Sequence, residues 1–563
     1  MTTVPALRAL SRSALTASSL IALLVSIAPV AAGTPTSCES LTAFAFPDTT
    51  INSAQSQSGG AYVAPDAWHL AFTDLPPYCE VQATIKPTPD SSIMVRVWMP
   101  TQRYNGRYLG AGNGGYAGGF FFSELADGIN RGFATANTDM GATGGAGVNG
   151  DALIGHPEKW KDFGWRATHL MTTFSKALIN TFYGDPANRS YFAGCSTGGQ
   201  QALMEAQRFP NDYDGILAGA PAFNRTHIHT VPVAQYRATH ATPASYIPAT
   251  KFDVVNQAVL AQCRGKDGGA ATDAFLTDPR ICKFDPATLA CPAGLEGTNC
   301  LNPDQVAAMK VYYAGSVNLA TGALINPGNA RGSETSNPAA LGFALNESLN
   351  EPSFDSLFKW VFGATWQWQT FDFNRDVTSV DQVLAADLNA TSTDLRAFAG
   401  RGGKLVMYAG WADPLIPSQS AINYFNALTT SFGGNGASAL KKTQGFARLF
   451  MVPGMWHCKE GPGPSSFGGV IAQPAPSYDA KYDLLTSLTQ WVEHGVAPTS
   501  VVATKYNNDT PQLGIAMQRP ICSYPQIPVY KGAGDPNAAA SFTCRDSETT
   551  AADNPKPAPQ YGP

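Results

Sequence analysis

The chain has 563 residues, of which 44% are hydrophobic, and a formal net charge of -5. This length allows a large buried core, and a mildly acidic chain with no segment dense in lysine and arginine argues against a nucleic-acid partner. Charged residues make up only 14%, while glycine and proline number 54 and 41, a composition typical of a loop-rich extracellular globule.

Residues 1–32 have the pattern of a secretory signal. Arg8 and Arg12 precede an apolar run over 14–28, and the small residues at 30–32 offer a cleavage site. A membrane anchor is the alternative, which the length of the run disfavours because a bilayer span takes about 20 residues. We therefore expect a mature chain that is secreted or periplasmic and not held in a membrane.

The first part of the mature chain predicts strands at 78–85 and 93–98, followed by a short strand at 108–109. This last strand enters the glycine-rich loop 110–115. The loop has neither the Lys-Ser/Thr ending of a P-loop nor a dinucleotide-binding spacing, so a phosphate cradle is the weaker interpretation. We interpret it as the source of backbone N–H groups at Gly112 and Asn113 for an oxyanion hole.

The stretch 191–200 contains Gly194-Cys195-Ser196-Thr197-Gly198, with a helix-prone run at 201–206 directly after it. A strand, a sharp turn and a helix in this order predict a nucleophile elbow with Ser196 on the turn. The N–H of Thr197 is then the second expected oxyanion donor. In a chain with 54 glycines, an ordinary glycine-rich turn is the alternative.

Helical spacing over 165–182 and strands at 133–139 and 213–221 complete an α/β pattern, which predicts a mostly parallel sheet covered on both faces. Residues 222–395, rich in Asp, Asn, Pro and Gly and with aromatic residues over 354–373, are interpreted as an inserted lid. Strands resume at 404–409 and 447–452. The expected division is a signal (1–32), a catalytic domain in two parts (33–221 and 396–563) and the lid between them.

Each resumed strand leads to a residue that ester hydrolysis requires. The first leads to Asp413 and the second to His457, which gives the chain order Ser196, Asp413, His457 of an α/β-hydrolase triad. His457 is the expected general base, and Asp413 is expected to orient it. Leu415 and Ile416, just after Asp413, are expected to form apolar walls of the acyl pocket. Taken singly, a structural histidine and an ordinary Asp-Pro turn are the alternatives.

Cys195 and Cys458 lie next to Ser196 and His457, and the chain has ten cysteines, an even number that favours disulfides in an exported protein. A disulfide between these two would join the nucleophile turn to the histidine loop. Two free buried cysteines are the alternative, because sequence alone does not fix connectivity.

The sequence resembles the tannase and feruloyl esterase family in Cys195-Ser196, the segments 410–417 and 452–458 and the tail 519–525. The family includes hydrolases of mono(2-hydroxyethyl) terephthalate. The resemblance implies an α/β-hydrolase fold, no catalytic cofactor and five disulfides. The implied pairs are Cys38–Cys79, Cys195–Cys458, Cys263–Cys282, Cys291–Cys300 and Cys522–Cys544.

The resemblance also implies a structural calcium in the lid loop that follows Cys263. Alternating oxygen ligands in a glycine-containing loop suit calcium, and the corresponding positions are Asp267, Gly269, Asp273 and Phe275. The loop departs from the family pattern, because Arg264 stands where the first aspartate is usual and two extra residues separate Asp267 from Asp273. A metal-free Asx turn is the alternative.

The function we expect is a serine carboxylesterase acting on esters of aromatic acids, with feruloyl esters first and the galloyl esters of tannins second. Terephthalate half-esters come third, because the stretch 332–374 contains no arginine and Lys359 is its only lysine. The alternative from another class is a non-catalytic binding protein on a hydrolase scaffold.

Overall fold

The computed structural model describes residues 35–65, 70–335, 337, 350–470 and 474–547. The signal-like segment 1–32 lies outside them. Within these ranges, none of the helices combines the length and the apolarity that crossing a membrane takes.

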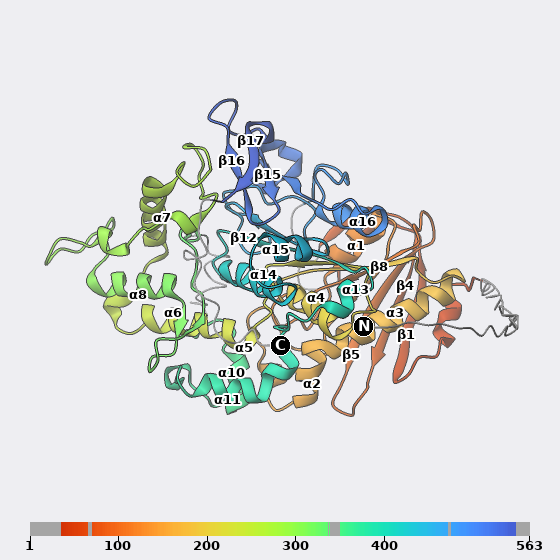
Figure 1. The fold of residues 1–563 in the computed structure, drawn as a ribbon. Coiled ribbons are helices and arrows are strands. Elements are labelled where there is room, and N and C mark those ends of the chain that lie inside the picture. Colours follow the sequence, from red (N-terminus) through yellow and green to blue (C-terminus); the bar gives the residue numbers. More distant parts are fainter. Residues whose placement is uncertain (1–34, 66–69, 336, 338–349, 471–473, 548–563) are drawn as a thin grey trace, which may run out of the picture.

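A nine-stranded sheet forms the centre of the molecule (Figure 1). Its strands are β1 (Thr49–Gln57), β4 (Tyr78–Ile85), β5 (Ile93–Pro100), β6 (Arg107–Ala111), β7 (Ala134–Thr138), β8 (Arg189–Cys195), β9 (Gly215–Gly219), β12 (Lys404–Gly410) and β13 (Ala447–Val452). The order is β1-β4-β5-β7-β6-β8-β9-β12-β13. From β7 to β13 all neighbours are parallel, whereas β1, β4, β5 and β7 pair antiparallel. The prediction of a mostly parallel sheet is confirmed.

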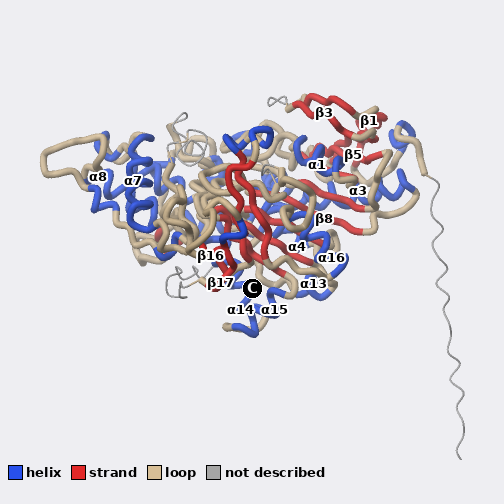
Figure 2. The backbone as a smooth tube through the Cα atoms, turned by 90° about the horizontal axis from the view of Figure 1, so that it is seen from above, coloured by secondary structure: helices blue, strands red, loops and turns tan. Residues whose placement is uncertain are grey.

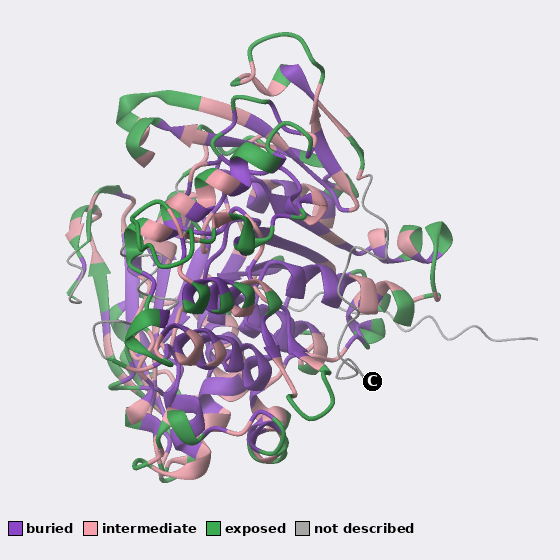
Figure 3. Cartoon of the chain, turned by 90° about the vertical axis from the view of Figure 1, so that its left-hand side faces the viewer, coloured by how far each residue is buried: buried purple, intermediate pink, exposed green. Residues whose placement is uncertain are grey.

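Both faces of the sheet are covered, because buried residues alternate between two hydrophobic cores along each central strand. In β8, Phe192 belongs to one core and Tyr191 and Ala193 to the other; in β12 the same holds for Met407 and Tyr408. The flanking helices are α1 (Phe122–Asn130), α3 (Ala167–Tyr183), α4 (Thr197–Arg208), α14 (Gln419–Ser431), α15 (Ala437–Gln444) and α16 (Leu484–His494). Figure 3 shows the buried layer running through the sheet and these helices, with exposed residues mainly on outer loops and helix faces.

The helix predicted over 165–182 is α3, which begins two residues later, at Ala167. Residues Asp162–Arg166 form a π-helical turn before α3. The side chain of Asp483 accepts a hydrogen bond from Thr486 N–H, which caps α16 at its first turn. At the other ends, Gly184 and Gly495 adopt the left-handed conformation that closes a helix.

Between β9 and β12 the chain leaves the sheet. Its helices there are α5 (Arg225–Ile228), α6 (Thr230–Thr239), α7 (Ala249–Cys263), α8 (Pro303–Ala314), α10 (Ser356–Phe362), α11 (Asp376–Val380), α12 (Ala386–Leu388) and α13 (Arg396–Gly400). Helices α7 and α8 lie at the end of the molecule opposite to β1 (Figures 1 and 2). Residues between 247 and 312 share a hydrophobic cluster of their own, whereas residues from 354 to 398 pack into the main core. The lid boundaries 222 and 395 stay a prediction.

Four short two-stranded sheets complete the described chain. They pair β2 (Gly60–Val63) with β3 (Ala71–Leu75), β10 (Ser316–Val317) with β11 (Leu324–Asn326), β14 (Ser500–Tyr506) with β15 (Ile515–Cys522), and β16 (Gln526–Tyr530) with β17 (Phe542–Asp546). All ten cysteines are bonded, in the five pairs that the family resemblance implies.

Candidate active site

Ser196 stands between the end of β8 and the start of α4, in the strained conformation of a nucleophile elbow. Its φ of 65° and ψ of -117° lie where residues with a Cβ rarely occur. The N–H of Ser196 donates to Gly219 O at 3.0 Å, and Ala222 N–H donates to Ser196 O at 3.1 Å. These two backbone bonds hold the turn in place, so the turn does not depend on a hydrogen bond from the Ser196 hydroxyl.

The glycines around Ser196 let three backbone segments approach one another. A Cβ on Gly194 would lie 2.6 Å from the Cα of Gly198, and a Cβ on Gly112 would lie 2.6 Å from the same atom. Both are closer than real Cβ contacts allow. Glycine is therefore required at 194 in the elbow and at 112 in the loop after β6, which packs against the first turn of α4.

Asp413 and His457 are in contact, although 44 residues separate them. His457 Nδ1 lies 2.8 Å from Asp413 Oδ2, while Asp413 Oδ1 accepts the N–H groups of Leu415 at 2.8 Å and Ile416 at 2.9 Å. The Asp413 side chain is 1% exposed and that of His457 is 18% exposed. This arrangement assigns the Nδ1 proton to the Asp413 side and leaves Nε2 of His457 as the acceptor for a nucleophile.

The Cys195–Cys458 disulfide brings the histidine loop to the nucleophile turn. In the sheet, β13 is three positions from β8, which corresponds to roughly 14 Å. The disulfide reduces this to a Cα–Cα distance of 6.0 Å between residues that directly neighbour Ser196 and His457. No hydrogen bond reaches the Ser196 hydroxyl among the described residues, so proton transfer from Ser196 to His457 stays a prediction. Such catalytic bonds are often long without substrate.

The two N–H groups predicted from the glycine-rich loop, those of Gly112 and Asn113, have other acceptors in the structure. Gly112 N–H already donates to Ala193 O at 2.8 Å, and Asn113 N–H donates to Gln201 Oε1 at 2.8 Å, so neither is free. The next residue, Gly114, has an N–H without a partner among the described residues. The N–H of Thr197 stands at the first position of α4, where the helix ladder leaves it unpaired. Thr197 stays the predicted donor from the elbow, and Gly114 replaces the two earlier candidates.

A residue between β9 and β12 that the sequence did not single out binds the segment that carries Asp413. Asn329 donates through Nδ2 to the carbonyl oxygens of Asp413 at 3.3 Å and Pro414 at 2.7 Å. It is 3% exposed, and it accepts a bond from Gln235 of α6 at 2.6 Å. An isolated asparagine in a loop carries no sequence signal for such a contact, because the partners are far apart in the chain.

Leu415 and Ile416 are 6% and 7% exposed and belong to the main core. Their backbone N–H groups bind Asp413, which is a function that the sequence reading did not include. Their expected role as walls of the acyl pocket stays a prediction.

The donor set of the expected calcium loop does not fit calcium. Asp267 uses both oxygens to accept the N–H groups of Gly269 and Thr277. Asp273 accepts the N–H of Ala270 and, at 2.5 Å, the guanidinium of Arg519. Calcium takes six to eight oxygen ligands, and here the loop offers two carboxylates, each oxygen of which already accepts a donor from the protein, one of these donors being the cationic Arg519.

The fourth predicted ligand of that loop, Phe275, has a structural contact. A Cβ on Gly454, which adopts a φ of +65°, would lie 2.5 Å from the ring of Phe275. The lid loop thus packs directly against the segment that carries His457. We interpret this loop as a hydrogen-bonded brace of the histidine segment.

A different cluster has the composition of a metal site. One ligand atom each of His169, Glu205 and Asp212 lie within 4.8 Å of one another. His169 Nδ1 is bonded to Asp212 Oδ2 at 2.7 Å, and Lys176 donates to the backbone carbonyl of Asp212. Both Glu205 oxygens are buried without a donor among the described residues. Burial, and next the Asp212 charge, hold the pKa of Glu205 well above its ordinary value, which favours a protonated carboxyl in this cluster.

Replacing Glu205 with glutamine tests this protonation. A carboxyl whose pKa is higher in the folded than in the unfolded chain stabilises the fold only below the unfolded pKa, and this stability is lost as the pH rises. Glu205→Gln is therefore expected to raise the melting temperature at pH 8 by about 2–4 °C and to leave it unchanged near pH 4. A lower melting temperature of the variant at pH 8, with a chelator-sensitive wild type, would instead establish a bound cation.

Fold and site together define an α/β-hydrolase with a strained nucleophile turn that is largely buried, and comparison with known proteins gives the family. The family model described as tannase and feruloyl esterase matches residues 79–545. An uncharacterized esterase of Xanthomonas campestris pv. campestris is 36% identical over 532 residues, which is 91% of each chain. A probable feruloyl esterase B-2 of Aspergillus flavus is 32% identical, covering 79% of this chain and 83% of its own.

Two further proteins agree with this assignment. The mono(2-hydroxyethyl) terephthalate hydrolase of Piscinibacter sakaiensis is 32% identical, over 84% of this chain and 85% of its own. The crystal structure of feruloyl esterase B from Aspergillus oryzae superposes with a TM-score of 0.81 at 27% identity and covers 90% of this chain and 99% of that one. The chain belongs to the tannase and feruloyl esterase family. It is a carboxylic ester hydrolase, as the sequence predicted.

Proposed function

We propose that this protein hydrolyses feruloyl esters through an acyl-enzyme formed on Ser196. His457 Nε2 takes the proton of the Ser196 hydroxyl as the oxygen attacks the ester carbonyl, and it then returns the proton to the leaving alcohol. Asp413 keeps the proton of His457 on Nδ1 and stabilises the imidazolium. The N–H groups of Thr197 and Gly114 bind the oxyanion, and each such donor contributes about 3–4 kcal/mol in related sites. Water, activated by the same histidine, releases the acid.

One observation carries the catalytic part of the proposal. The His457–Asp413 contact of 2.8 Å is joined by the Cys195–Cys458 bond to the turn on which Ser196 stands. Three side chains from separate strand ends are thereby held in one region of the molecule.

The choice of substrate is supported by family membership and by the charge of the lid. Lys359, the only lysine in 332–374, is ion-paired with Asp151, Glu351 and Asp355 at 3.2–3.4 Å. A cation that already has three carboxylate partners is a poor site for the second carboxylate of a terephthalate half-ester. Galloyl esters stay second and terephthalate half-esters third. The similarity to the terephthalate half-ester hydrolase is the observation that keeps the last class in the ranking.

Turnover of methyl ferulate, methyl gallate and mono(2-hydroxyethyl) terephthalate by one purified sample ranks the three classes. We expect the highest kcat/KM for methyl ferulate. A higher value for either other ester would reassign the substrate, and no turnover of all three would remove esters of aromatic acids as the substrate class.

We also propose that the protein is exported, to the periplasm or out of the cell. Five disulfides are typical of oxidising compartments. The signal-like pattern of 1–32 agrees with this. Mass spectrometry of the mature N-terminus tests it, and an intact N-terminus on the protein isolated from its natural host would contradict cleavage.

A further inference from the structure

A guanidinium without a counter-ion is buried next to the nucleophile turn. Arg225, the first residue of α5, is 1% exposed, and its Nη2 donates to Thr197 Oγ1 at 2.6 Å. Its Nε and Nη1 are buried without a hydrogen-bond partner, and no carboxylate pairs with it among the described residues. Other buried arginines do have one: Arg131 pairs with Asp483 and Arg519 with Asp273. A buried charge left unpaired is costly, which is why this exception calls for a function.

The groups around Arg225 add no negative charge. Burial raises the pKa of Tyr116 well above its ordinary value, so its hydroxyl stays protonated. Burial, and next the charge of Arg225, hold the pKa of His229 well below its ordinary value, so that ring stays neutral. The remaining neighbour is the ring of Phe163, whose centroid is 4.8 Å from the guanidinium carbon. In the resting protein the positive charge therefore has one neutral acceptor, the Thr197 hydroxyl, and one aromatic contact, and no carboxylate among the described residues.

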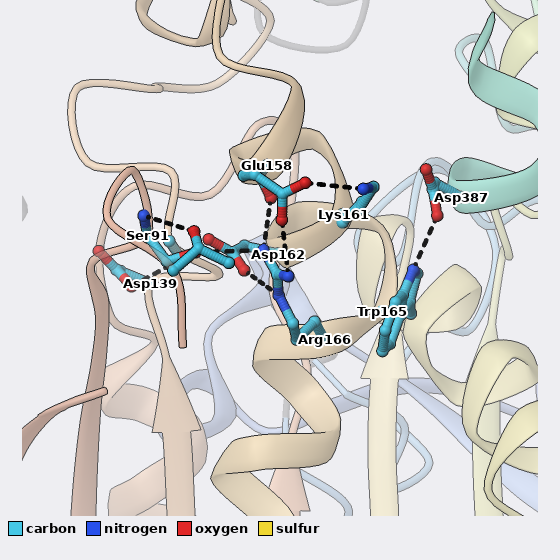
Figure 4. Close-up of polar contacts among 10 residues, drawn as sticks. Ser91, Asp139, Glu158, Lys161, Asp162, Trp165, Arg166 and Asp387 are labelled. Atoms are coloured by element: carbon cyan, nitrogen blue, oxygen red, sulfur yellow. Dashed lines mark hydrogen bonds and ion pairs between the residues drawn. The ribbon is translucent and has the colours of Figure 1, made fainter. Parts of the chain in front are cut away.

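Ion pairs hold the turn that carries Phe163. Phe163 lies in the π-helical turn Asp162–Arg166. Figure 4 shows the guanidinium of Arg166 directed toward Asp162 and Glu158, with Ser91 beside Asp162. Arg166 bonds to Asp162 at 2.5 Å and to Glu158 at 2.8 Å. The place of the Arg225 charge is thus fixed before any substrate binds, as electrostatic preorganisation requires.

Hydrogen bonds lead from Arg225 to the Thr197 side chain and from there to the glycine loop that contains Gly114. Thr197 Oγ1 accepts from Arg225 and donates to Gly115 O at 2.6 Å, so it connects the first residue of α4 with the glycine loop. The N–H groups proposed to bind the oxyanion belong to Thr197 and to Gly114, the neighbour of Gly115. One side chain, that of Thr197, lies between the guanidinium and this pair of N–H groups.

We propose that Arg225 is a positioning residue that sets the oxyanion hole and supplies it with positive potential, an inference that rests on the proposed function. The ground-state ester is neutral and gains little from a buried cation. The transition state places a negative charge on the carbonyl oxygen, which becomes the missing counter-charge of Arg225. Because the gain occurs mainly in the transition state, it raises kcat rather than lowering KM.

The test compares Arg225→Met, which keeps the length of the side chain and removes the charge, with Arg225→Lys, which keeps the charge. On methyl ferulate we expect Arg225→Met to lower kcat about 10- to 100-fold with KM changed less than about threefold. The affinity for phenylboronic acid, which forms a tetrahedral anion on a catalytic serine, is expected to fall by a similar factor. Arg225→Lys is expected to restore most of both.

The matched control is Arg237→Met. Arg237 also lies between β9 and β12, but its guanidinium binds the carbonyl oxygens of Trp368 and Gln369. We expect its kcat to stay within about twofold of wild type.

Two outcomes would overturn the inference. The first is an Arg225→Met variant with wild-type kcat and boronate affinity. The second is a loss in Arg225→Met that Arg225→Lys does not restore although its melting temperature equals that of the wild type, because a preserved charge would then have no effect. Failure of the proposed function is distinguishable, since the wild type itself would then lack turnover of methyl ferulate.

Discussion

Replacing Ser196 with alanine is expected to lower kcat on methyl ferulate by roughly 10⁴-fold or more. The fold should not change, because the Ser196 hydroxyl has no hydrogen-bond partner among the described residues and the strained turn is held by backbone bonds. Initial rates and a thermal melt on the same preparation measure both effects. Ser465→Ala is the matched control, since Ser465 is fully buried with an unpartnered hydroxyl far along the chain, and it should keep wild-type rates.

Full activity of Ser196→Ala would show that another residue is the nucleophile. The same experiment addresses a non-catalytic binding protein on a hydrolase scaffold, because such a protein would hydrolyse no ester even as the wild type. Membership in an esterase family already disfavours that alternative.

Replacing Asp413 with asparagine is expected to lower kcat by about 10⁴-fold with little change in melting temperature. The amide can keep its oxygen toward the N–H groups of Leu415 and Ile416, which now bind Asp413 Oδ1. Its NH₂ then faces His457 Nδ1, which forces the ring proton onto Nε2. In that tautomer His457 has no lone pair for the Ser196 proton. The activity loss is measured on methyl ferulate, and a boronate titration shows whether the Ser196 oxygen can still attack an electrophile.

A second His–Asp pair provides the control. His156 Nδ1 lies 2.8 Å from Asp90 Oδ1, and neither residue belongs to a segment that carries a proposed catalytic or positioning residue. Asp90→Asn makes the same chemical change there and should leave kcat within about twofold. Equal losses in both variants would mean that these pairs act through the fold and not through catalysis.

The sheet could be predicted from sequence because each central strand is short, apolar on both faces and bounded by glycine or proline. The expected strand at 404–409 is β12 at Lys404–Gly410, and the expected strand at 447–452 is β13 with the same bounds. The packing of the insertion between β9 and β12 could not be predicted in the same way. Its second half shares the main core, and contacts between distant segments leave no periodic pattern.

In the candidate site, the sequence predicted which residues take part, but it did not predict which donors and acceptors are already hydrogen-bonded to other groups. The glycine loop was identified, but which N–H is free depends on Gln201, whose side chain takes the N–H of Asn113 from the neighbouring helix. The calcium expectation likewise did not include Arg519, which reaches Asp273 across 246 residues. Arg225 carries no motif at all, and only its burial beside Thr197 draws attention to it.

The sulfur bridge between residues 195 and 458 has a practical consequence for producing this enzyme. It spans two intervening strands, so a polypeptide made in a reducing cytosol can complete its sheet and still hold the imidazole away from the hydroxyl. Well-folded material of low specific activity from such a host would then report on thiol status rather than on substrate choice. Recombinant batches are best compared only after their thiols have been counted.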